Sequence, residues 1–220
     1  MLKGIAHFIS ILFHPLLMLT YMLVLLMLIN PYLFGVHSVS GNKVLILFVF
    51  FSSFIIPGFA VFLMKQLDFI KSIQLHDRME RTGPYIITGV FYLWMFRNFL
   101  ENPNIPSAYT IFVLGSTIGL FLAFFINIFS KISAHAVGMG GLVGMVVISL
   151  FLFSYEDFIL HLPSIGMLRI GMNHLLMWVV ILSGMVGTAR LLLNAHEPKD
   201  LYGGYMVGFL AMLVSLWILG

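Results

Sequence analysis

Long, nearly unbroken apolar runs are the feature of this sequence that most limits its possible folds. Seven such runs lie at residues 5–30, 43–64, 84–100, 107–129, 137–154, 168–189 and 202–219. An α-helix needs about 20 mainly apolar residues to cross the hydrocarbon core of a bilayer. Only 9% of the residues are charged, against about 25% in a soluble domain. We therefore expect an all-α integral membrane protein, with residues 1–220 forming a single transmembrane domain built as a bundle of about six to seven transmembrane helices.

Several of these runs carry residues that disturb a straight membrane helix. The third run is short and contains Arg97 near its end, where a long side chain can reach the head groups. Pro15 and Pro57 lie inside the first two runs, where kinks are tolerated if neighbouring helices satisfy the freed carbonyls. A polar stretch over residues 155–164 links the fifth and sixth runs. The fifth run begins with small residues, which serve either close helix packing or a site. They are Gly138, Gly140, Gly141 and Gly144.

The composition also limits the chemistry and the partners. The chain has no cysteine, which excludes disulfides and thiolate metal sites. Its eight histidines show no pair at metal-ligand spacing with a third ligand, so we expect no metal and no other cofactor. The net charge of +3 is small and indicates a lipid bilayer with anionic head groups, and no nucleic acid, as the partner.

The few charges gather in three short segments. Seven lie in residues 65–81, Lys131 stands alone between the fourth and fifth runs, and four lie in residues 190–200. These segments follow the second, fourth and sixth runs, and the exits of even-numbered helices all emerge on one face of a membrane. The three segments are therefore expected to meet, provided that the third run crosses the membrane. If it did not, the first segment would lie on the opposite face.

The first segment offers a pair of cations. Lys71 and Arg78 are seven residues apart, two helical turns, so on a helix they would share a face and suit a phosphate. The alternative is a juxtamembrane loop in which Asp77 and Glu80 simply pair with the arginines. His76, Asp77 and Arg81 are secondary candidates for the same site.

The second and third segments each place a histidine beside a predicted helix start. Ser133 and His135 precede the fifth run, where the N-terminus of a helix favours an anion. In the third segment, Arg190 can clamp phosphate, His196 can act as nucleophile or base, and Asp200 one turn later can orient it. The alternatives are an interfacial His135 satisfied by water or a backbone carbonyl, and an incidental pair in a polar turn.

Two further histidines, His14 and His174, lie within apolar runs. Ionisable residues inside a membrane are candidates for function. A hydrogen bond between helices is the interpretation that we favour for both.

Two histidines, a carboxylate and several cations together suit phosphoryl transfer without a metal, because positioning and electrostatic stabilisation do most of that work. The residues resemble the type 2 phosphatidic acid phosphatases, which are related to vanadium haloperoxidases. The family's three motifs are Lys-x6-Arg-Pro, Pro-Ser-Gly-His and Ser-Arg-x5-His-x3-Asp. They correspond here to Lys71-x6-Arg78-Met79, Ile132-Ser133-Ala134-His135 and Ala189-Arg190-x5-His196-x3-Asp200, followed by Gly204 and Gly208.

The chain departs from these motifs at three positions. Met79 stands in place of proline, Ala134 in place of glycine and Ala189 in place of serine. A Cβ at position 134 crowds any phosphate that approaches the backbone there, and position 189 lacks a hydroxyl. The charged and imidazole positions are all kept.

The resemblance implies a role for each matching residue within a catalytic core of about residues 65–215. His196 would be the nucleophile that forms a phosphohistidine, Asp200 would orient it, and His135 would be the general acid for the leaving group. The phosphate would be held by Lys71, Arg78, Ser133 and Arg190.

The resemblance also implies an activity and a location. We expect a metal-independent phosphatase that hydrolyses a lipid phosphate monoester or pyrophosphate, of the phosphatidate, phosphatidylglycerol phosphate or undecaprenyl pyrophosphate type. It would be a multi-pass protein of the cell (inner) membrane with its site on the extracytoplasmic face, although the positive-inside rule alone would place these cations in the cytoplasm. The alternatives are a catalytically silent protein that binds lipid head groups and a small transporter. Against the transporter, the charges lie at helix exits and not at mid-membrane.

Overall fold

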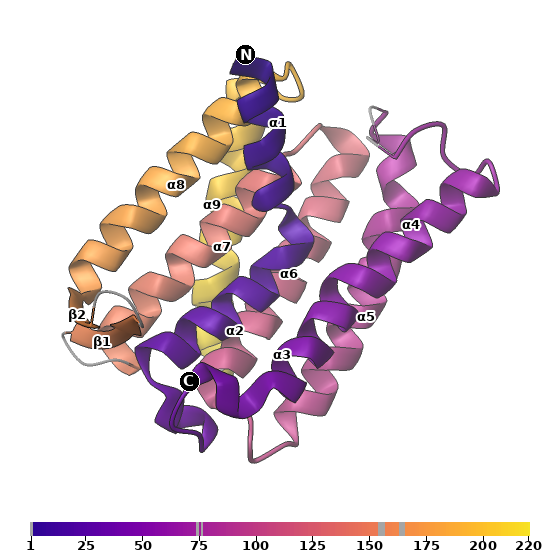
Figure 1. Ribbon diagram of the computed structural model, residues 1–220. Helices are drawn as coiled ribbons and strands as arrows, with labels where there is room; N and C mark the ends of the chain where they lie inside the picture. The colour runs from indigo at the N-terminus through magenta and orange to yellow at the C-terminus, as the bar shows by residue number, and fades with distance from the viewer. Residues whose placement is uncertain (1, 74, 76, 154–156, 163–165) are drawn as a thin grey trace.

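The fold is a bundle of long helices, as the apolar runs predict (Figure 1). The computed structural model describes residues 2–73, 75, 77–153, 157–162 and 166–220. The α-helices in these residues are α1 (Leu2–Leu12), α2 (Met18–Ile29), α3 (Lys43–Phe50), α4 (Ile56–Gln66), α5 (Thr82–Leu100), α6 (Ser107–Phe129), α7 (Ala134–Ile148), α8 (Met172–Leu192) and α9 (Pro198–Leu219). Shorter 3-10 turns occur at Pro15–Leu17, Pro31–Phe34, Val39–Asn42 and Met79–Arg81, and π-helical turns at Phe51–Ile55 and Ser149–Phe153.

Six helical segments among the described residues are long and apolar enough to span a membrane. They are Leu2–Ile29, Pro31–Gln66, Ser107–Phe129, Ala134–Phe153, Met172–Leu192 and Pro198–Leu219. The prediction of an all-α, multi-pass membrane protein is therefore confirmed. The third predicted run forms α5, which is 19 residues long but is not among the six. It nevertheless lies alongside α4 and α6 in the bundle (Figure 1), so the chain passes from one end of the bundle to the other between residues 82 and 100.

Both prolines in the first two runs stand at breaks in the helices. Pro15 begins the 3-10 turn that separates α1 from α2, and the Nδ1 atom of His14 accepts a hydrogen bond of 3.3 Å from the backbone N–H of Leu16. Pro57 lies in the first turn of α4, directly after the π-helical turn Phe51–Ile55. Because of the first break, α1 packs against α8 while α2 packs against α6 and α7.

The sixth predicted run begins too early. Residues 168–171 belong to strand β2 (Gly166–Gly171), which pairs antiparallel with β1 (Asp157–Leu162), and α8 begins only at Met172 and continues to Leu192. Gly166, at a φ of +90°, begins the second strand, and Arg169 forms an ion pair with Asp157 across the hairpin. Residues 155, 156, 163 and 164 of the predicted polar link lie outside the described residues.

Helices α7 and α9 pack backbone to backbone. A Cβ added at Gly208 would meet the backbone of Val137 and Gly141, and one added at Gly140 would meet the backbone of Tyr205. Nearer the start of both helices, a Cβ at Gly204 would stand 2.9 Å from the carbonyl oxygen of Ser133. Glycines spaced four apart permit such close approach between membrane helices. Of the two roles considered for the glycines of the fifth run, packing is the one that the structure shows for Gly140, Gly141 and Gly144, which face α9.

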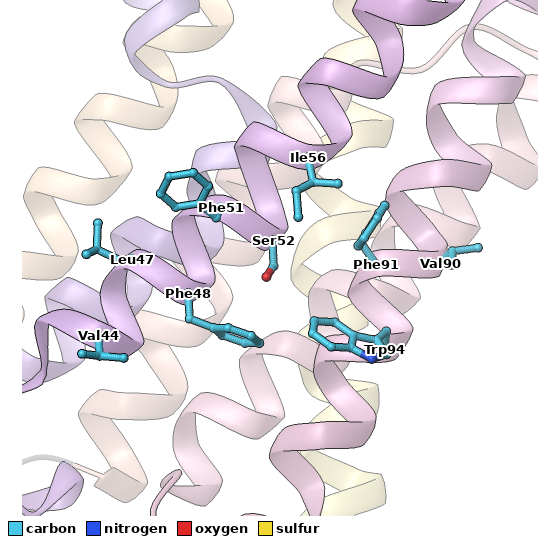
Figure 2. Close-up of a pocket in the computed structure, with 9 residues that line it drawn as sticks. All are labelled: Val44, Leu47, Phe48, Phe51, Ser52, Ile56, Val90, Phe91 and Trp94. Atoms are coloured by element: carbon cyan, nitrogen blue, oxygen red, sulfur yellow. The ribbon is translucent and has the colours of Figure 1, made fainter.

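The larger of two described pockets is an apolar groove between α3–α4 and α5 (Figure 2). Its volume is about 620 Å³, and the rings of Phe48 and Trp94 approach across it to 5.6 Å between centroids. The lining residues are Val44, Leu47, Phe48, Phe51, Ser52, Ile56, Val90, Phe91 and Trp94. Since none of them is charged, the groove suits hydrocarbon and not a phosphate.

Candidate functional site

The three charged segments meet at one end of the bundle. Nη1 of Arg78 donates to the carbonyl of Phe129 at 2.7 Å, and Nη1 of Arg81 donates to the carbonyl of Ile132 at 3.2 Å. These bonds join the segment after α4 to the turn between α6 and α7. The backbone N–H of Ser133 donates to the carbonyl of Asp200 at 3.2 Å, which joins the same turn to the start of α9. The segments expected on one face thus lie at the same end of the bundle (Figure 1), and hydrogen bonds link them.

A buried histidine–aspartate pair lies at the start of α9. Nδ1 of His196 is 3.3 Å from Oδ2 of Asp200, and the two residues are 8% and 4% exposed. A carboxylate only accepts hydrogen bonds, so this contact places the ring proton on Nδ1 and leaves a lone pair on Nε2. Nε2 is therefore the nitrogen available as a nucleophile or base.

Asp200 also stabilises its own helix. Its Oδ2 accepts a hydrogen bond of 3.2 Å from the backbone N–H of Glu197, and the Glu197 side chain completes a capping box at the N-terminus of α9. The second oxygen, Oδ1, is buried and has no hydrogen-bond partner among the described residues. The carboxylate is thus fixed by the helix start, and it in turn fixes the orientation of His196.

A polar pocket of about 330 Å³ opens beside this pair. It is lined by Ser130, Lys131, Asn194, Ala195, His196, Glu197, Lys199 and Asp200. Lys199 pairs with Glu197 at 2.9 Å on the surface, whereas no ion pair involves Lys131 in the described part of the chain. Lys131 is therefore the lysine of the pocket that is available to an anionic ligand.

The surroundings keep His196 uncharged at neutral pH. Burial and the positive charges of Arg81 and Arg190 together lower the pKa of His196 from 6.5 to about 4, against the raising effect of the bond to Asp200. A neutral imidazole retains the lone pair that nucleophilic attack requires. The same surroundings are positive overall, so they favour an anion next to His196.

Arg81 is the cation of the first segment that acts on His196. Its Nε donates to the carbonyl of Leu75 at 3.0 Å, and its charge is the largest electrostatic influence on the His196 ring. From the sequence Arg81 was only a secondary candidate. The sequence feature that points to Arg81 is its position just before the third apolar run. Arg190 likewise stands next to an apolar run, at the end of the sixth.

Lys71 and Arg78 lie at the surface, outside the polar pocket. The backbone N–H of Lys71 donates to Oε1 of Glu80 at 2.9 Å, and Arg78 is held by the carbonyl of Phe129. Their assignment as phosphate ligands stays a prediction. His76 lies outside the described residues.

Ser133 and His135 are held by contacts within the protein. Ser133 is fully buried and caps α7, its Oγ accepting from the backbone N–H of Ala136 at 3.4 Å. Nε2 of His135 lies 3.0 Å from the carbonyl of Ser10 in α1, and its ring meets that of His14 edge to face at 5.7 Å. A backbone carbonyl is one of the partners considered for His135 as an alternative to catalysis. The role of His135 as a general acid stays a prediction.

Ser10 is a site neighbour that sequence reasoning missed. Nη1 of Arg190 donates to its hydroxyl at 3.4 Å, while its carbonyl faces His135. The only available signal was that Ser10 lies one helical turn before His14, on the same face of a helix. The described residues contain no group of three or more metal-ligating side chains.

Comparison with known proteins adds no relative: no family model matches the chain, and no curated protein or solved structure is similar to it. The resemblance to the lipid phosphatase motifs therefore rests on the residues between positions 71 and 208 alone.

Proposed function

We propose that this membrane protein is a lipid phosphatase that hydrolyses a phosphate monoester or pyrophosphate on a lipid carrier. The observation that carries the proposal is the buried His196–Asp200 pair beside a polar pocket, with Arg81, Arg190 and Lys131 supplying positive charge. The pocket lies at the end of apolar helices, so a lipid would present its phosphate at head-group level while its chain stays among the spans.

The chemistry would proceed in two displacements. Nε2 of His196 attacks phosphorus, the bond from phosphorus to the leaving oxygen breaks, and that oxygen takes up a proton, which the family resemblance assigns to His135. Water then gives a proton back to His135 as it attacks the phosphohistidine, the P–N bond breaks, and inorganic phosphate leaves while the imidazole of His196 regains its lone pair. The cations stabilise the charge on the equatorial oxygens in both steps.

The test is phosphate release by the purified protein in detergent from phosphatidate, phosphatidylglycerol phosphate and undecaprenyl pyrophosphate. His196→Ala should lose turnover, because it removes the nucleophile. His174→Ala is the matched control, since His174 is an exposed histidine in the first turn of α8. Rapid quenching should trap an acid-labile phosphoprotein in the wild type and none in His196→Ala. Equal turnover by His196→Ala and the wild type would refute the mechanism.

A second candidate is a catalytically silent protein that binds lipid head groups. The contact between His135 and the carbonyl of Ser10 favours it, because that contact occupies a nitrogen of the proposed acid. The three departures from the family motifs, at Met79, Ala134 and Ala189, point the same way. This candidate predicts binding of the same lipids without release of phosphate from any of them.

A further inference from the structure

The first helix supplies a hydroxyl to the arginine of the third motif. Ser10 of α1 is 6% exposed, and its Oγ accepts a hydrogen bond of 3.4 Å from Nη1 of Arg190. The two residues are 180 positions apart, and α1 packs against α8 along this contact. Arg190 is thus held from a helix that carries none of the predicted motif residues.

The anchoring leaves one particular edge of the guanidinium free. Nε of Arg190 is buried and has no hydrogen-bond partner among the described residues, and no described bond involves Nη2. Nε and Nη2 form one side of the planar group, the side that binds two oxygens of a phosphate or carboxylate at once. A buried donor left without a partner is costly, so a free N–H in this position indicates a ligand.

The charges around Arg190 define the chemistry of that ligand. Arg81 and Lys131 add positive charge near His196, and the carboxylate of Asp200 is already engaged with His196 and the backbone N–H of Glu197. The free edge therefore suits an anion with two coplanar oxygens.

We propose that Ser10 is a positioning residue for Arg190. Its hydroxyl holds Nη1, so that the Nε–Nη2 edge faces two oxygens of a phosphate. This inference rests on the proposed function for the identity of the anion. Ser10 acts only through Arg190 and does not touch the substrate.

A double-mutant cycle tests this role. Binding of inorganic phosphate to the purified full chain is measured by titration calorimetry for the wild type, Ser10→Ala, Arg190→Lys and the double variant. Ser10→Ala should weaken phosphate binding about five-fold, the loss of one modest hydrogen bond to a charged group. In the Arg190→Lys background the same change should have no further effect, because lysine lacks the paired edge.

The control is Ser215→Ala, which removes another buried hydroxyl of a helix, bonded at 2.8 Å to the carbonyl of Met212. It should leave phosphate binding unchanged. If Ser10→Ala binds phosphate as tightly as the wild type, or weakens binding equally in both backgrounds, the positioning role is wrong while the phosphatase proposal stands. If the wild type binds phosphate but releases none from any lipid, the phosphatase proposal falls and the cycle still decides the role of Ser10. A wild type that does not bind phosphate overturns both.

Discussion

Gly208→Ala should push apart α7, which carries His135, and α9, whose first turn follows His196 directly. An added Cβ would stand 2.7 Å from the backbone nitrogen of Gly141 and closer still to the carbonyl oxygen of Val137, whereas an ordinary contact begins at 3.4 Å. Both obstacles are backbone atoms and cannot rotate away, so α7 and α9 must move apart by about 1 Å. Overpacking of this kind costs about 1–3 kcal/mol of stability. A 1 Å displacement of His135 from His196 should lower turnover about 100-fold.

Thermal unfolding in detergent and phosphate release would measure the two effects. Gly203→Ala is the matched control on the same helix, because a Cβ there meets nothing within 4 Å. It should be neutral or slightly stabilising, since alanine favours a helix over glycine by about 1 kcal/mol. If Gly208→Ala unfolds at the same temperature as Gly203→Ala, the close backbone contact between α7 and α9 is wrong.

Four further predictions concern the charges of the site and its orientation in the membrane. Arg81→Ala should lower kcat/KM of phosphate release at least ten-fold. Arg78→Ala should have a smaller effect, because the charge of Arg81 acts on His196 whereas Arg78 is exposed and bonded to the carbonyl of Phe129; equal losses would refute this ranking. The acid limb of kcat/KM should lie near pH 4 and not near 6.5, because His196 reacts as the neutral form. In the unfolded chain His196 binds a proton at higher pH than in the folded one. The free energy of unfolding should therefore fall by about 3 kcal/mol between pH 6.5 and 4 because of this histidine. When unfolding is measured as a function of pH, His196→Ala should show a fall that is smaller by this amount. The turn between α5 and α6 lies at the opposite end of the bundle from the site (Figure 1). Asn104→Cys in this turn should therefore react with an impermeant thiol reagent only from the cytoplasmic side if the site faces outward.

The sequence predicted the helices well where apolar length alone decides the structure. Residues 107–129 form α6 with the predicted bounds. The start of the sixth run was wrong because Leu168 and Ile170 are apolar in a strand as they would be in a helix. A short apolar stretch does not distinguish the two, and only its pairing with Phe158 and the other residues of β1 does.

The candidate site, too, was predictable from the sequence only in its local contacts. His196 and Asp200 are four residues apart on the chain, so their contact follows from helical spacing. The contacts of Arg81 with Ile132 and of Ser10 with Arg190 join distant segments, and no periodicity encodes them. Sequence patterns thus found the local pair, while the long-range partners required the three-dimensional structure.

The polarity of α5 has a consequence for the biogenesis of the protein. Six segments among the described residues are long and apolar enough to span a bilayer, and α5 is not one of them. The first charged segment nevertheless meets the other two, because α5 passes through the bundle. Arg97 and Glu101 form an ion pair at the end of α5 that is opposite the site. We expect α5 to enter the membrane together with α6 as a helical hairpin. A chain cut after residue 105 should therefore leave residues 82–100 outside the bilayer, on the face of the membrane that carries the site, which a glycosylation or protease-protection reporter would detect.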